Sequence, residues 1–158
     1  MKKLALLLAL AALAVPAAAS AETSTVNAFA CASIHGGAVT VPAGTQVVVT
    51  EGWATKSLGL TQDFLKAQTT TISVNGGPAL DVSGFWGPPE SHPLAWETSF
   101  SYPTGIVLGT GESLTFTVTT SISHRLLDGL FFASGTGGKP LFSDPGTLFE
   151  FSCTVTGA

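Results

Sequence analysis

Charged residues are scarce in this chain. Lys and Arg number 6 and Asp and Glu 10 among 158 residues, so only 10% of the chain is charged. Without Lys2 and Lys3, which belong to the leader discussed below, four basic residues stand against ten acidic ones, a net charge of −6. Nucleic acids and anionic lipids bind through clustered Lys and Arg. Neither class of partner is therefore expected.

Catalytic and cofactor motifs are also lacking. The sequence has no dinucleotide or phosphate loop, no G-x-S-x-G turn and no D-x-D-x-D-G calcium loop. Ser123, His124 and Asp128 supply the residue types of a hydrolase triad, but sequence neighbours rarely adopt nucleophile–base geometry. A non-enzymatic protein without a cofactor is expected, and a small exported hydrolase that uses His124 and Asp128 is the alternative.

Histidine is rare as well, with three in the chain. His35, His92 and His124 all fall in predicted loops, where Glu90 or Asp128 could join them to bind zinc or copper. The long spacings match no metal motif, and three separate solvated turn residues explain the pattern equally simply. No metal is therefore expected, and the three histidines remain the candidates if one binds.

The chain has one long apolar run, and it lies at the start. Met1-Lys2-Lys3 precedes the apolar segment Leu4–Val15, and Ala19-Ser20-Ala21 follows it. This order is typical of a secretory signal peptide cleaved before Glu22. The run is too short for a membrane span. We expect residues 1–21 to be a leader, and residues 22–158 to be one secreted or periplasmic domain without a transmembrane segment.

Two cysteines are present, Cys31 and Cys153. In an exported chain an even pair most simply forms one disulfide, and two free thiols or a shared metal are the alternatives. A disulfide would join the first predicted strand to the last and enclose nearly the whole domain.

Alternating patterns of apolar and hydroxyl residues predict β-strands. The clearest is Glu112–Ile122, where Leu114, Phe116 and Val118 alternate with Ser and Thr. Further strands are predicted at Thr25–Ser33, Ala38–Val41, Gln46–Trp53, Thr69–Val74, Leu80–Val82, Leu94–Tyr102 and Thr147–Thr156, with short ones at Ile106–Leu108 and Leu130–Ala133. Helix is limited to one turn, Gln62–Ala67, capped by Thr61. An all-β sandwich of about seven to nine strands follows.

Two segments share one form, an apolar residue, a glycine turn and a strand. They read V-P-A-G-T-Q-V-V-V at Val41–Val49 and L-G-T-G-E-S-L-T-F at Leu108–Phe116. The chain resembles exported bacterial immunoglobulin-like modules in these segments, among them small secreted proteins with no assigned activity. The resemblance implies an immunoglobulin-like antiparallel β-sandwich and supplies no site residues. The cysteine spacing of antibody domains is absent.

Strand direction predicts where the loops gather. If successive strands run antiparallel, the turns Pro42–Thr45, Asn75–Pro78 and Pro103–Gly111 share one end. The longer segments His35–Gly37, Ala54–Gln68, Gly84–Pro93 and Ser123–Gly146 then share the other end, where loops on a rigid scaffold carry recognition. The candidate binding residues in these loops are Phe64, Phe85, Trp86, His92, His124, Arg125 and Asp128.

The aromatic side chains of these loops have two interpretations. They either pack inward and close the sandwich, or they form a recognition surface for a macromolecule, protein or glycan. The leading hypothesis is a secreted or surface-associated binding module that uses its long-loop end. Because Trp86 is a ring able to stack on a sugar, a carbohydrate-binding module is a further alternative.

Overall fold

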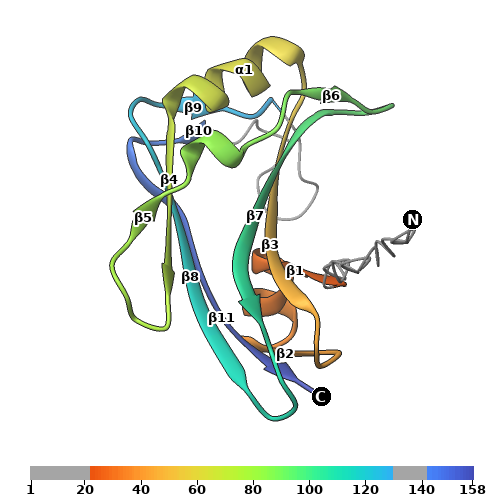
Figure 1. The fold of residues 1–158 in the computed structure, drawn as a ribbon. Coiled ribbons are helices and arrows are strands. Elements are labelled where there is room, and N and C mark those ends of the chain that lie inside the picture. Colours follow the sequence, from red (N-terminus) through yellow and green to blue (C-terminus); the bar gives the residue numbers. More distant parts are fainter. Residues whose placement is uncertain (1–21, 130–141) are drawn as a thin grey trace, which may run out of the picture.

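Two β-sheets pack face to face and enclose the core (Figure 1). The computed structural model describes residues 22–129 and 142–158. One sheet has the order β1 (Thr23–Asn27), β3 (Gln46–Thr55), β7 (Trp96–Val107), β6 (Glu90–Ser91). The other has the order β2 (Ala38–Val41), β11 (Gly146–Gly157), β8 (Ser113–Ile122), β4 (Gln68–Val74), β5 (Leu80–Asp81). The predicted all-β sandwich is confirmed.

Short elements complete the described part of the chain. Strands β9 (Leu126–Leu127) and β10 (Phe142–Ser143) form a small antiparallel pair. The helical elements are η1 (Ala30–Ile34), α1 (Leu58–Ala67) and η2 (Ser83–Phe85). No helix in residues 22–129 and 142–158 is long and apolar enough to cross a membrane. The strand predicted at Leu130–Ala133 lies outside the described residues.

Strand β8 has the alternating burial that its sequence predicts. Leu114, Phe116 and Val118 are fully buried and face the opposite sheet. On the outer face, hydroxyl groups of β8 pair with those of β11 across the ladder. These pairs are Ser113–Thr156 (2.9 Å), Thr115–Thr154 (3.0 Å) and Thr117–Ser152 (2.8 Å). One strand thus supplies apolar packing inside and neutral cross-strand hydrogen bonds outside.

The first strand is shorter than predicted. It ends at Asn27, whose side-chain Oδ1 accepts the backbone N–H of Ala30 at 2.8 Å. This local bond gives the backbone an alternative to the sheet and begins the helical turn η1. Cys31 therefore lies in η1 rather than on a strand, and it is bonded to Cys153 of β11 with a Cα–Cα separation of 5.8 Å. The predicted disulfide is confirmed.

The turn η1 also changes the direction of the edge strands. It takes the chain from one sheet to the other, so that β1 runs parallel to β3 and β2 runs parallel to β11. The resemblance implied an antiparallel sandwich, and these two edge pairs depart from that arrangement. The remaining strand pairs, which form the centres of the sheets, are antiparallel.

The predicted single helical turn is a longer helix. Helix α1 spans ten residues, and its N-cap is Ser57 rather than Thr61. Thr61 is buried and bonds Thr55 Oγ1 at 2.7 Å, so its hydroxyl serves packing instead of capping. Thr61, Phe64 and Ala67 recur every three residues and bury one face of the helix.

Strand β7 extends further than expected. It continues through Pro103 to Val107 and absorbs the separate short strand predicted at Ile106–Leu108. The proline is tolerated beside a register irregularity in the partner strand, between Gln46 and Val48. Glu51 and Gly52 keep regular register with β7.

Most connections separate to the two ends as predicted. At the turn end, Gly44 N–H bonds Leu108 O and Asn75 N–H bonds Thr115 O. The opposite end, here called the helix end, contains α1, β6, β9 and β10 (Figure 1). The segment His35–Gly37 does not reach it: Gly37 O accepts Thr154 N–H near the turn end, because η1 reverses the chain early.

Candidate functional site

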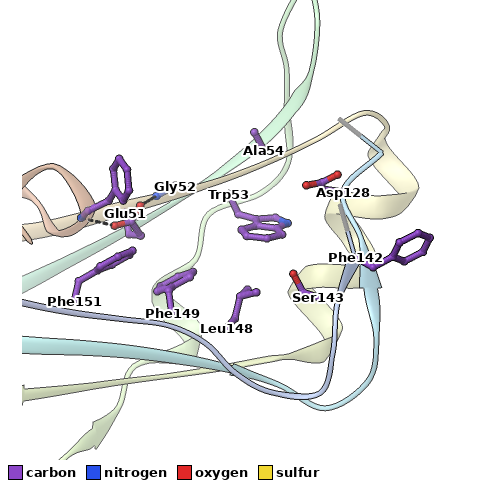
Figure 2. Close-up of a pocket in the computed structure, with 11 residues that line it drawn as sticks. Glu51, Gly52, Trp53, Ala54, Asp128, Phe142, Ser143, Leu148, Phe149 and Phe151 are labelled. Atoms are coloured by element: carbon purple, nitrogen blue, oxygen red, sulfur yellow. Dashed lines mark hydrogen bonds between the residues drawn. The ribbon is translucent and has the colours of Figure 1, made fainter. Parts of the chain in front are cut away.

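A groove of about 460 Å³ opens between β3 and β11, on one flank of the sandwich near the helix end. In Figure 2, Glu51 and Trp53 of β3 point across this groove toward Phe149 and Phe151 of β11. The remaining lining residues are Phe29, Gly52, Ala54, Asp128, Phe142, Ser143 and Leu148. Its volume falls within the usual range for a ligand pocket.

The groove exists because both sheets lose an edge strand at the same place. Strand β1 accompanies β3 only as far as Thr50, and β2 accompanies β11 only from Thr154 to Gly157. Beyond these points, β3 and β11 have no described strand on this flank. In the described part of the chain, two adjacent strand edges thus lack a neighbouring strand, and an apolar space lies between them. Such edges can pair with another chain.

Five of the eleven described residues that line the groove are aromatic. Phe29 and Phe151 meet edge to face, with ring centroids 5.6 Å apart, and Phe149 stacks on Phe151 at 5.0 Å. One face of the Trp53 indole stacks on Phe64 at 4.9 Å. The alternation of β11 places Phe149 and Phe151 inward, as the sequence predicts, but the missing edge strand leaves them only half buried.

Glu51 is a buried carboxylate in this apolar setting. It alternates in phase with the buried Val47 and Val49, so its side chain faces the sandwich interior. Its Oε2 accepts the backbone N–H of Phe29 at 2.8 Å, and its Oε1 accepts that of Gly52 at 2.9 Å. Desolvation raises the pKa of Glu51 above its ordinary value of 4.5, and the two backbone hydrogen bonds oppose the rise.

The raised pKa of Glu51 predicts a pH-dependent stability. Just above pH 4.5 the folded protein holds more protons at this group than the unfolded chain does. The free energy of unfolding should therefore fall as pH rises from 4.5 through the folded pKa. We expect the wild type to lose stability relative to Glu51→Gln as pH rises above 4.5 in denaturant titrations. A difference that is constant over this range would contradict the prediction.

The β9–β10 region bounds the groove at the helix end. Asp128 is buried, and its carbonyl oxygen accepts the backbone N–H of Lys56 at 2.7 Å. Arg125 lies over the Phe142 ring at 4.4 Å and pairs with Asp144 at 3.2 Å. Of the predicted loop residues, the structure therefore places Asp128 in the groove and Arg125 in contact with one of its lining side chains.

Two other predicted binding residues belong to the core. Phe64 is fully buried and meets Trp86 edge to face at 4.9 Å. Trp86 is also buried, and its Nε1–H donates to Thr70 Oγ1 at 2.9 Å. These rings pack inward and close the helix end of the sandwich, which is the first of the two interpretations considered for the loop aromatics. They present no surface to a partner.

The remaining candidates are dispersed. Phe85 is exposed and meets Tyr102 edge to face at 5.0 Å, away from the groove. His92 pairs with Glu97 at 3.6 Å, while His35 lies beside β2. Within the described ranges, no three His, Cys, Asp or Glu side chains come together as a metal site.

The residues that come together as a possible hydrolase triad differ from those that the sequence suggested. His124 Nε2 lies 3.1 Å from Oδ1 of Asp63, which is on α1, and His124 Nδ1 lies 3.3 Å from Ser123 Oγ. Asp63 thus takes the position expected for Asp128. The Ser–His–Asp chain is exposed, and its residues are not among those lining the groove.

Sequence reasoning missed Glu51 and Phe29 as site residues. A signal for Glu51 was present, since it follows Val47 and Val49 at a spacing of two, where an inward side chain is expected. Phe29 carried no such signal, because its position depends on the helical turn that replaces the predicted strand.

The chain was compared with models of known protein families, with curated proteins and with solved structures, and nothing matches in any of the three. The function is therefore argued from the site itself.

Proposed function

We propose that this protein is an exported, non-enzymatic binding module whose partner occupies the groove between β3 and β11. The order of residues in the 21-residue leader supports export, and the Cys31–Cys153 disulfide is compatible with it. The resemblance to immunoglobulin-like modules agrees with the sandwich fold. The proposal moves the binding surface from the long loops to the adjacent flank.

The observation that carries the proposal is the partial burial of the groove rings. A side chain that only filled the core would be enclosed, as Phe64 and Phe100 are. Phe149 and Phe151 instead face inward while remaining accessible through the open edge. Apolar surface in a preformed concavity favours binding of an apolar group, since little ordering is needed.

Nile red, a neutral dye that fluoresces in apolar surroundings, tests whether the groove binds. We expect the wild type to bind the dye, and Phe151→Ala to bind it about tenfold more weakly because a ring contact contributes roughly 1–2 kcal/mol. Phe85→Ala is the control, because this ring also meets one aromatic neighbour edge to face but lies outside the groove. Equal weakening in both variants, or no dye binding by the wild type, would refute the proposal.

The Ser123–His124–Asp63 contacts favour a second candidate, a surface hydrolase. In the familiar triad arrangement the carboxylate orients one ring nitrogen and the serine approaches the other. Both nitrogens are engaged here, but the site is exposed and excludes little water. Hydrolysis of simple esters by the wild type, lost in His124→Ala, would assign the function to this site instead.

A further inference from the structure

The lining of the groove is acidic as well as aromatic. Its described lining residues include two carboxylates, Glu51 and Asp128, and no Lys, Arg or His. Asp128 has an interaction partner of its own, so the charge that a ligand can meet is that of Glu51. Both acidic residues are largely buried. An apolar site with this charge is complementary to a group that combines a hydrocarbon part with a positive charge.

The hydrogen bonds of Glu51 leave room for further donors. A carboxylate has about four acceptor positions, and Glu51 uses one on each oxygen for the backbone N–H groups of Phe29 and Gly52. These neutral donors fix the carboxylate in place and do not cancel its charge. About two positions remain, one on each oxygen, and an ammonium group, which has three N–H donors, can use them.

The rings suit the rest of such a group. Aromatic faces attract a cation through their negative quadrupole, and Trp is the strongest of them. Trp53, Phe149 and Phe151 line the same space as Glu51 (Figure 2). The methylene chain of a lysine can pack along these rings while its ammonium group reaches the carboxylate.

The strand edges indicate the class of partner. The groove lies between edges of β3 and β11 that no strand in residues 22–129 and 142–158 covers, and such edges can hydrogen-bond to the backbone of an extended polypeptide. A lipid head group or a sugar does not pair with strand edges in this way. We therefore propose that the groove binds a lysine side chain of a protein partner, with its ammonium group at Glu51 and its stem against Trp53, Phe149 and Phe151. This inference rests on the proposed function.

Three probes of similar length test the inference on the intact protein: hexylammonium, hexyltrimethylammonium and 1-hexanol. Binding is followed by the NMR shift of the Trp53 indole N–H. We expect hexylammonium to bind at least about tenfold more tightly than 1-hexanol. Cation–π attraction in a desolvated site is enough to give a difference in affinity of this size. A preference for hexyltrimethylammonium would indicate a choline-type head group and overturn the assignment to lysine.

Matched variants locate the charge. Glu51→Gln should bring the hexylammonium and 1-hexanol affinities to within about twofold of each other and leave 1-hexanol binding unchanged. Glu150→Gln should preserve the wild-type preference, because Glu150 lies between Phe149 and Phe151 in sequence but faces the opposite side of the sheet. If Glu51→Gln fails to fold, the wild-type comparison of charged and neutral probes decides.

The outcomes separate this inference from the proposed function. Equal binding of hexylammonium and 1-hexanol to the wild type overturns the lysine assignment and leaves an apolar binding groove. If no probe binds, the groove has no affinity for a hydrocarbon chain, and both the inference and the proposed function fail.

Discussion

Replacing Cys31 and Cys153 by alanine should lower the free energy of unfolding by about 5 kcal/mol. The two residues are separated by 122 positions, and the entropy lost on closing a loop of this length in the unfolded chain gives this value. Alanine is preferred to serine because both sites are almost fully buried. A hydroxyl there would add the cost of an unsatisfied polar group.

The effect is large because of what the bond joins. It connects η1, at the point where the chain passes from one sheet to the other, to the inner face of β11. Guanidinium unfolding followed by tryptophan fluorescence measures the loss. Wild-type protein treated with a reductant should lose the same stability, which controls for packing changes caused by the substitutions. A loss below about 1 kcal/mol in both would show that the unfolded chain gains little freedom.

The second large effect is expected at Phe64. Phe64→Ala should lower the free energy of unfolding by about 3–5 kcal/mol, the usual cost of removing a buried ring and leaving a cavity. Phe64 stacks on Trp53 and meets Trp86 edge to face, so its removal breaks the contact between α1 and the sandwich.

Phe85→Ala is the matched control for Phe64→Ala. Both residues come from predicted binding loops, but Phe85 is exposed and has one ring neighbour, Tyr102. We expect its substitution to cost less than about 1 kcal/mol. Denaturant unfolding of the two variants distinguishes a core residue from a surface residue. Similar losses in both would mean that Phe64 is not the ring that holds α1 in place.

Periodicity allowed the central strands to be predicted. In β8 and in the C-terminal half of β11, alternation with a spacing of two is enough to place residues such as Phe116 and Val155 in the core. Their environment is regular, with neighbours on both edges, so local pattern and tertiary structure agree. The disulfide could be predicted for a similar reason, since two cysteines in an exported chain have few alternatives.

The groove could not be predicted in the same way. It depends on where β1 and β2 stop, and β1 ends at Asn27, whose Oδ1 accepts a hydrogen bond from the backbone N–H of Ala30. The segment Thr25–Ser33 fits a strand pattern along its whole length, so the pattern gives no sign of this bond. The parallel pairing of β1 with β3 and of β2 with β11 also has no local signal in the sequence, because it depends on η1 taking the chain from one sheet to the other.

The hydroxyl pairs between β8 and β11 have a consequence for where such a protein can work. They are uncharged, so dissolved ions do not screen them, and they do not titrate at ordinary pH. These hydrogen bonds should therefore persist through changes in ionic strength and acidity, a useful property if the protein is exported as we propose.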